Sequence, residues 1–272
     1  MSELALQRGK SKFWRELNAV AAIVARDITL TLKSPSALIM SLAMPVVMMG
    51  MLGGTLAQNM AGGLSFNYGP FMLIGMLVNM LVMTTTMGMT SLVEDRTTDF
   101  TQEMLISPVS RYSIVVGKIL GSSFTAVVSI FGTLVEGLFM GITLHPGQLL
   151  AILALAPLIC LAGGALAMLV IGLVKSSKTA NFAVMLMTMP QMFLSGAIIP
   201  ISQSNGVLLV LSRAMPMTYA LDLVRAVVYA GTPEYDSVVM FNPMVNLTVI
   251  AALTVVCLII GTFFFARSEK NR

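Results

Sequence analysis

Long apolar stretches follow one another along most of the chain, separated by short polar or charged segments. Because the hydrocarbon core of a bilayer takes about 20 apolar residues of helix, this pattern predicts six transmembrane helices, near residues 36–57, 68–91, 113–142, 148–174, 180–200 and 243–266. We therefore expect an all-α polytopic membrane protein. It forms a single transmembrane domain over residues 1–272, with both ends of the chain on the same side of the membrane.

The segment before the first predicted span, residues 1–33, has a different pattern. From residue 13 onward, at about 100° per residue, charged side chains share one face and apolar side chains the other; the apolar face holds Phe13, Leu17, Val20, Val24 and Ile28. This pattern predicts an interfacial helix along the membrane before Ser34-Pro35 turns the chain inward. A signal peptide is the alternative, but the segment has no uninterrupted apolar core followed by a cleavage site.

The longest charged interruption, residues 92–112, lies between the second and third predicted spans. Asp99 can act as an N-cap with Gln102 three residues later, which predicts a short amphipathic helix that Ser107-Pro108 ends. Its apolar side chains are Phe100, Met104 and Leu105. We expect this capped helix to face water and to dock in a groove of another protein.

Three stretches, in the same order, resemble the type-2 ATP-binding-cassette (ABC) export permeases. They are MLISPVSRYSIVVGK from Met104 to Lys118, FLSGAIIPI from Phe193 to Ile201, and MPMTYALDLVRAVVYAG from Met215 to Gly231. Together with the hydropathy pattern the resemblance covers most of the chain, and it is nearest to the drug-exporting, daunorubicin-resistance-like branch. It implies a permease subunit that moves its substrate out of the cell.

The resemblance also implies partners. ATP and Mg would be bound by two copies of a separate nucleotide-binding ATPase subunit, with no cofactor in this chain. The permease would work as a pair, with an identical copy or with a paralogue, among membrane lipids. The ATPase subunit would contact the cytoplasmic coupling loop, residues 92–112, through Asp99, Phe100, Glu103, Met104, Leu105, Ser107 and Pro108.

Composition and charge support a membrane protein independently of this resemblance. The chain is 57% hydrophobic with a mean hydropathy of +0.89, which is more apolar side chain than a soluble domain of 272 residues buries. Nearly all of the 16 Lys and Arg residues lie before the first span, around the central loop, between the fourth and fifth spans or in the tail. The positive-inside rule then predicts cytoplasmic termini and a cytoplasmic central loop. We expect the protein in the cell membrane of a bacterium or archaeon. The net charge of +4 thus indicates topology, and we expect no nucleic-acid partner.

Two predicted spans carry stripes of methionine and small polar residues. Their members recur mostly at spacings of three and four and so share a helix face; they are Met72, Met76, Asn79, Met83, Thr86 and Thr90 in the second span and Asn181, Thr188, Gln191 and Ser195 in the fifth. One interpretation is ordinary helix packing through small polar groups. The other is a path for amphipathic substrates, because flexible Met side chains adapt to varied apolar shapes. The resemblance favours the second, since the corresponding helices of related permeases line the subunit interface and the substrate path.

Glu136 is the one carboxylate well inside a predicted span, near the outer end of the third. An intramembrane charge is a functional-site candidate. Two interpretations stay open: a structural bond to a neighbouring helix, and a part in substrate or proton handling.

Residues 202–242 are too long for a simple loop and too interrupted by proline for two full spans. Short re-entrant or interfacial helices at the outer face fit this composition. Asp222 and Arg225 are three residues apart, so we expect them to form an outer ion pair on one helix face. The resemblance implies that these short helices close the outer end of the path.

Several functions are excluded by what the sequence lacks. The Gly-Lys dipeptides at residues 9–10 and 117–118 do not have the spacing of a phosphate-binding loop, and no catalytic set accompanies His145, so we expect no enzymatic activity. Cys160 and Cys257 fall inside predicted spans, which argues against a disulfide framework or a metal site.

The leading hypothesis is therefore an ATP-driven export permease for a drug, lipid or hydrophobic natural product. The alternative is an ion-gradient-driven secondary transporter or channel. That class usually needs several buried ionisable groups or broken helices near the middle of the membrane.

Overall fold

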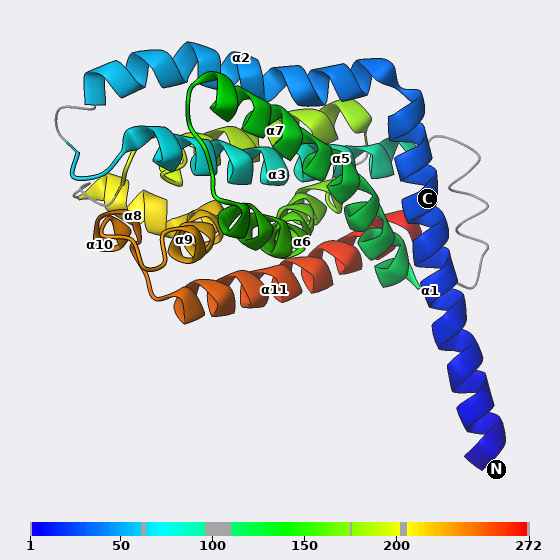
Figure 1. Ribbon diagram of the computed structural model, residues 1–272. Coiled ribbons are helices and arrows are strands. Elements are labelled where there is room, and N and C mark those ends of the chain that lie inside the picture. The colour runs from blue at the N-terminus through cyan, green and yellow to red at the C-terminus, as the bar shows by residue number, and fades with distance from the viewer. Residues whose placement is uncertain (1, 61–63, 96–109, 175, 202–205, 271–272) are drawn as a thin grey trace.

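The computed structural model describes residues 2–60, 64–95, 110–174, 176–201 and 206–270, and every regular element in these ranges is a helix (Figure 1). The helices are α1 (Ser2–Lys33), α2 (Pro35–Met60), α3 (Tyr68–Asp95), α5 (Arg111–Phe139), α6 (Pro146–Ile171), α7 (Ser177–Leu194), α8 (Val207–Ala214), α9 (Pro216–Val228), α10 (Tyr235–Val238) and α11 (Pro243–Lys270). The expected all-α class is confirmed for this part of the chain. The expected coupling helix, with Asp99, Phe100, Glu103, Met104, Leu105, Ser107 and Pro108, lies outside the described residues.

Helix α3 lies at the centre of the bundle. It packs against α2, α5, α6, α7 and α9. Every residue from 71 to 80 is buried, because a helix that is apolar on all sides is stable when neighbouring helices cover each face. The side chains of α3 therefore contact mainly other helices of the same chain.

The ends of the bundle differ in their elements (Figure 1). Helix α1 stands across one end, at the end where α11 finishes, while α8, α9 and α10 lie at the opposite end. Helix α1 packs mainly on α5 and also touches α2. The turn between α1 and α2 falls at Ser34, and Pro35 begins α2, as the sequence predicts.

Close packing of α6 on α11 depends on glycine. A Cβ on Gly172 would lie 2.7 Å from the carbonyl oxygen of Gly261, and a Cβ on Gly261 would lie 2.7 Å from the carbonyl carbon of Met168. Small residues allow helix backbones to approach closely in a membrane. A larger side chain at either glycine would push the two helices apart.

Four helical segments are long and apolar enough to cross a membrane: 68–95, 111–139, 146–171 and 235–267. Two bent pairs pass the same test together, 12–33 with 38–47 at 84° and 207–214 with 216–228 at 83°. The described part of the chain thus holds four to six candidate spans, which makes it a multi-pass membrane protein.

The individual spans match the prediction unevenly. Helices α3, α5, α6 and α11 coincide with four predicted spans. The predicted span 36–57 falls within α2, and 180–200 overlaps α7, which ends at Leu194 and is not among the four long apolar helices. Gly196 follows with a φ of +85°, a conformation that ends helices at glycine.

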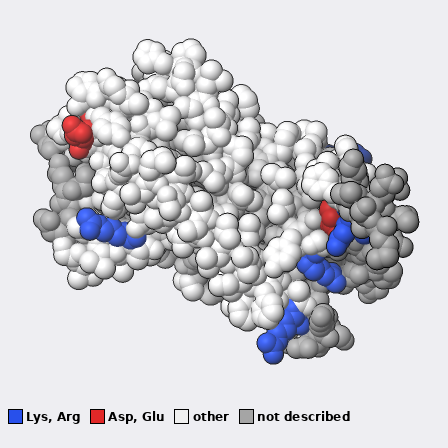
Figure 2. Space-filling view, turned by 90° about the horizontal axis from the view of Figure 1, so that it is seen from below, with Lys and Arg blue, Asp and Glu red and all other residues white. Residues whose placement is uncertain are grey.

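Charged side chains gather at the two ends of the molecule, as Figure 2 shows for one face. Between them lies a broad surface without Lys, Arg, Asp or Glu. Helix α11 also has exposed apolar side chains, among them Val255, Ile259 and Phe263. Such a surface fits the hydrocarbon layer of a bilayer.

Candidate functional site

A small cavity lies where α3, α7 and α9 meet. Its volume is about 80 Å³, and it is lined by Asn79, Met80, Val82, Met83, Thr188, Met189, Gln191, Met192 and Met217. Four residues of the two expected stripes therefore line one cavity, although the two from α3 are more than 100 residues away from the two from α7 in the chain. Five methionine side chains form much of its wall.

Some polar groups of this cavity form hydrogen bonds within the chain, and one does not. Gln191 Oε1 accepts from the backbone N–H of Met217 at 3.3 Å, and Thr188 Oγ1 donates to the Val184 carbonyl at 2.9 Å. Asn79 is only 3% exposed, and its Nδ2 donates to Met217 Sδ at 3.9 Å. Its Oδ1 is buried without a hydrogen-bond partner in the described part of the chain. The cavity thus offers one acceptor among thioether groups.

The other stripe residues do not reach this cavity. Met72 and Met76 are buried in the core, and Thr86 and Thr90 donate to carbonyl groups of their own helix. In the second stripe, Asn181 of α7 is exposed, and Ser195, which follows α7, is buried. Contact of the buried α3 residues with a second permease copy would require the helices of one chain to separate.

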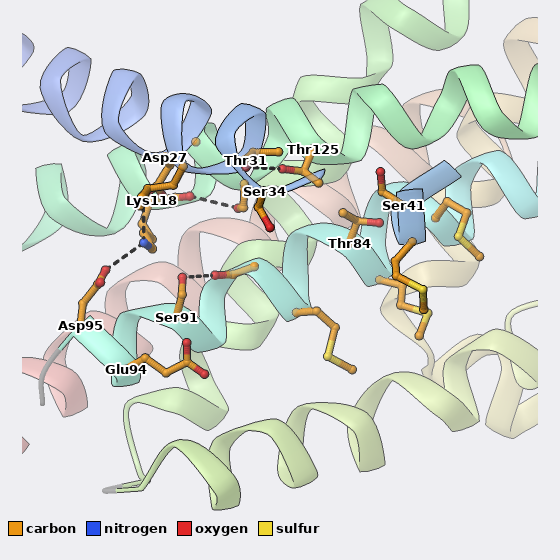
Figure 3. A pocket seen from close by; sticks show the side chains of 18 residues that line it. Asp27, Thr31, Ser34, Ser41, Thr84, Ser91, Glu94, Asp95, Lys118 and Thr125 are labelled. Atoms are coloured by element: carbon orange, nitrogen blue, oxygen red, sulfur yellow. Dashed lines mark hydrogen bonds and ion pairs between the residues drawn. The ribbon is translucent and has the colours of Figure 1, made fainter. Parts of the chain in front are cut away.

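A cluster of four charged side chains joins α1, α3 and α5 at the opposite side of α3 (Figure 3). Lys118 Nζ of α5 donates to Asp27 Oδ1 of α1 at 3.1 Å and to Asp95 Oδ2 of α3 at 2.9 Å. Arg26 of α1 donates to both oxygens of Asp95, at 2.9 and 3.2 Å. The side chains of Lys118 and Asp27 are 5% and 10% exposed, so this charge cluster is largely removed from water.

Sequence reasoning missed the charge cluster. Arg26 and Lys118 served only as indicators of topology, and Asp27 and Asp95 had no predicted partner, because Lys118 contacts partners 91 and 23 residues away along the chain. A usable signal was present, since Lys118 falls inside the predicted span 113–142. A lysine there needs a buried partner or a path to water.

A second contact links α1 to the start of α5. Both carboxylate oxygens of Glu16 accept from the backbone N–H of Ser110, at 2.9 and 3.1 Å. Ser110 is the N-cap of α5, and its side chain accepts from the N–H of Tyr112 at 3.3 Å. Helix α1 therefore holds the residue before segment 96–109, Asp95, and the residue after it, Ser110.

The expected ion pair between Asp222 and Arg225 is wrong. Asp222 instead accepts from the backbone N–H groups of Met240 and Phe241 and from Asn246 Nδ2, at 2.8 to 2.9 Å. Two backbone N–H groups that precede α11 and one side-chain amide within α11 thus bind the two carboxylate oxygens.

Arg225 also binds backbone rather than a carboxylate. Its Nη2 donates to the Gly196 carbonyl at 2.9 Å and to the Phe71 carbonyl at 3.4 Å, and its guanidinium carbon lies 3.5 Å from the centroid of the Phe71 ring. The Gly196 carbonyl follows the end of α7, and the two N–H groups that Asp222 binds precede α11, so both charges bind backbone groups beside helix ends. An i, i+3 spacing permits an ion pair but does not exclude better partners.

Glu136 lies inside the bundle. It is 4% exposed, and its Oε1 lies next to Gly50 of α2, 3.8 Å from where a Cβ on that glycine would stand. The carboxylate therefore faces α2 and does not extend to the surface.

Comparison with known proteins gives one family. The family model described as ABC-2 type transporter matches residues 18–229, which include α3, the charge cluster and the cavity at α3, α7 and α9. No curated protein gives a significant match to the chain.

Proposed function

Because this chain belongs to the ABC-2 type transporter family, whose membrane domains are permease components that generally work with ATPase partners, we propose that it is the membrane subunit of an ATP-driven exporter. A separate nucleotide-binding subunit, in two copies, supplies ATP hydrolysis. The substrate is hydrophobic or amphipathic: a drug, a lipid or a natural product. The observation that carries this proposal is the meeting of residues from the two stripes in one methionine-lined cavity between α3, α7 and α9.

The chemistry of that cavity supports an apolar substrate with one hydrogen-bond donor. Methionine side chains repack around varied shapes, so the small volume can widen on binding. Asn79 Oδ1 accepts a hydrogen bond from the substrate and gains the partner that it lacks in the closed cavity. A donor that satisfies it orients the substrate between α3 and α7.

Energy enters through residues 92–112. The ATPase subunit binds the amphipathic segment that carries Phe100, Met104 and Leu105. Support comes from α1, which binds Asp95 and Ser110 on either side of the segment. A displacement of the segment is thereby passed to α1, and through Lys118 to α5.

A second permease copy covers the exposed face of α7. Phe182, Leu186, Met189 and Phe193 are 47% to 67% exposed on this helix. They lie on the helix whose buried side, with Thr188 and Gln191, lines the cavity. Each copy has its cavity directly behind α7. If two copies meet at α7, the two cavities lie on either side of one interface and together give more space for a substrate.

The test uses inside-out membrane vesicles that contain the permease with its ATPase subunit. ATP is expected to drive uptake of a fluorescent apolar amine, and Asn79→Leu is expected to reduce the uptake rate about tenfold, the effect of losing roughly 1.4 kcal/mol of binding. Asn18→Leu, which changes an exposed amide on α1, is the matched control. Uptake that continues without ATP and stops when ionophores collapse the ion gradients would instead establish a secondary transporter.

A further inference from the structure

The segment that follows α7, residues 195–201, lies against the start of α3. All but one of its residues are buried. Gly75 of α3 lies directly against the Ala197 carbonyl, and a Cβ at Gly75 would overlap with that oxygen. The Tyr68 hydroxyl, at the start of α3, donates to the Ile198 carbonyl at 2.8 Å. The segment is therefore packed onto the first two turns of α3.

Segment 195–201 also lies beside one end of the small cavity between α3, α7 and α9. The last turn of α7 supplies Gln191 and Met192 to the cavity wall, and the segment begins directly after that turn. On α3, Asn79 lines the cavity and is one helical turn, about 6 Å along the axis, beyond Gly75. Along the axis of α3, the segment therefore lies between the cavity and the end of the bundle that holds α8 and α10 (Figure 1).

Few hydrogen bonds hold this segment in place. Beyond the end of α7, no backbone–backbone hydrogen bond joins residues 196–201 to another described residue. Instead, two side chains bind carbonyl groups of the segment: Tyr68 of α3 and Arg225 of α9. Because the attachment consists of side-chain contacts, the segment can move away from α3 while the helices on either side of it stay folded.

Arg225 provides the stronger of these two attachments. Its Nη2 donates to the Gly196 carbonyl at 2.9 Å, and its guanidinium carbon lies 3.5 Å from the centroid of the Phe71 ring. Arg225 is 4% exposed, and no carboxylate among the described residues pairs with it, since the one acid of α9, Asp222, binds groups next to α11. A charged donor forms hydrogen bonds roughly twice as strong as a neutral one. The buried charge of Arg225 therefore acts on the carbonyl groups where segment 195–201 meets α3.

Helix α9 is a fixed base for this contact. Asp222, three residues before Arg225, accepts from two backbone N–H groups that precede α11 and from Asn246 within α11, at 2.8 to 2.9 Å. These bonds join α9 to the start of α11. When the bond between Arg225 and Gly196 breaks, the segment is thus the side of the contact that is free to move.

We propose that segment 195–201 is the gate of the small cavity and that Arg225 is the positioning residue that keeps this gate closed. Release of the Gly196 carbonyl lets the segment leave α3 and opens the cavity toward the end of the bundle that holds α8 and α10. Water that enters accepts hydrogen bonds from the guanidinium, which offsets the lost contact. The direction in which a substrate passes the gate rests on the proposed export function; the gate itself does not.

The test measures access to the cavity through a cysteine in its wall. Met192→Cys places a thiol beside the segment, and the rate of labelling by a membrane-impermeant maleimide reports access to it. The reagent is applied on the side of the membrane from which Ser65→Cys, an exposed position before α3, is labelled. Cys160 and Cys257 are buried, so their labelling shows whether the whole bundle has loosened.

Arg225→Gln is expected to raise the labelling rate of Met192→Cys at least about tenfold, because a neutral amide replaces a buried charged donor. Arg225→Lys keeps the charge without the planar group that covers the Phe71 ring, so it is expected to give an intermediate rate. Arg213→Gln removes an exposed charge from α8, at the same end of the molecule, and is the matched control with an unchanged rate.

A second variant decides the case in which Arg225→Gln exposes Cys160 as well. Tyr68→Phe removes one hydroxyl bond to the segment and leaves α9 unaltered. It is expected to raise the labelling rate of Met192→Cys about threefold, the effect of losing one neutral hydrogen bond, and to leave Cys160 unlabelled.

Labelling of Met192→Cys that is no faster with Arg225→Gln than with Arg213→Gln would overturn the proposal. Where Arg225→Gln has loosened the bundle, an unchanged rate with Tyr68→Phe, or an equal increase at Cys160, would overturn it too. The expected labelling without ATP-driven uptake would contradict the proposed export function and leave the gate intact. Unchanged labelling together with ATP-driven uptake would reject the gate alone.

Discussion

Buried charges have different kinds of partner at the two ends of the bundle. Lys118 binds carboxylates of two other helices, whereas Asp222 and Arg225 bind mainly backbone groups where helices end. Hydrogen bonds from these side chains to backbone groups fix the places where helices end. Ion pairs among side chains join separate helices, so the charge cluster ties α1 to α3 and α5.

Replacing Lys118 by Met is expected to reduce the free energy of unfolding by about 3 to 5 kcal/mol. The substitution removes the more buried of the two cations that contact both Asp27 and Asp95, and it leaves Arg26 alone beside the two carboxylates in surroundings largely removed from water. Thermal unfolding of the purified protein measures the change. Lys33→Met, at an exposed position of α1, is the control, and equal midpoints for the two variants would contradict the importance of the charge cluster.

At the scale of elements, much of the fold could be predicted from the sequence. Helices α3, α5, α6 and α11 follow from long apolar runs, because the length of such a run sets where a helix can lie in a membrane. The predicted positions of helix ends were less accurate than the predicted helices themselves. Helix α5 ends at Phe139, before the predicted residue 142, because Gly141 adopts a φ of +73°.

Contacts between elements could be predicted much less well. The two stripes were identified by spacing, but the residues that share the cavity depend on how α3 crosses α7. The pairing of Lys118 with Asp27 joins positions 91 residues apart, and no local pattern specifies such a partner. Local rules also predicted the wrong partner for Asp222, because they do not include backbone groups of distant segments.

Changing Phe100 and Leu105 together to Asp is expected to leave membrane insertion intact, since neither residue lies in an apolar span. It is expected to release the ATPase subunit or to uncouple ATP hydrolysis from transport. Two buried apolar side chains contribute about 1.5 to 3 kcal/mol each at an interface, and a carboxylate cannot replace them.

Copurification and substrate-stimulated ATPase activity measure these effects. Thr101→Asp adds charge to the same segment without removing an apolar side chain and serves as the control. A double variant that retains its ATPase subunit and transports normally would show that residues 92–112 are only a connection between spans.

At the scale of the whole molecule, exposed apolar surface between the charged ends has two uses: contact with lipid and contact with another subunit. Val255 and Ile259 of α11 and Leu186 and Met189 of α7 are all about half exposed or more. The two helices differ in what lies behind the exposed face. Residues of α7 line the small cavity, whereas none of its lining residues belongs to α11.

Met189→Cys is therefore expected to form a disulfide with its counterpart in a second copy when membranes are oxidised. Val255→Cys, of similar exposure on α11, is expected to remain monomeric, because lipid covers that face. Non-reducing electrophoresis distinguishes the two results. Equal crosslinking at both positions would mean random collision, and crosslinking at Val255 alone would assign the interface to α11.

The contact between Asp27 and Lys118 also has a consequence for biosynthesis. These residues are 91 positions apart, so at about 5 to 20 residues per second the ribosome needs roughly 5 to 20 s to add the second after the first. During that interval the completed α1 has no Lys118 to neutralise Asp27 and no Ser110 to bind Glu16. The N-terminal helix can therefore take its final position only after α5 has begun to emerge, and a nascent chain stopped before residue 110 should carry an α1 that proteases cut readily.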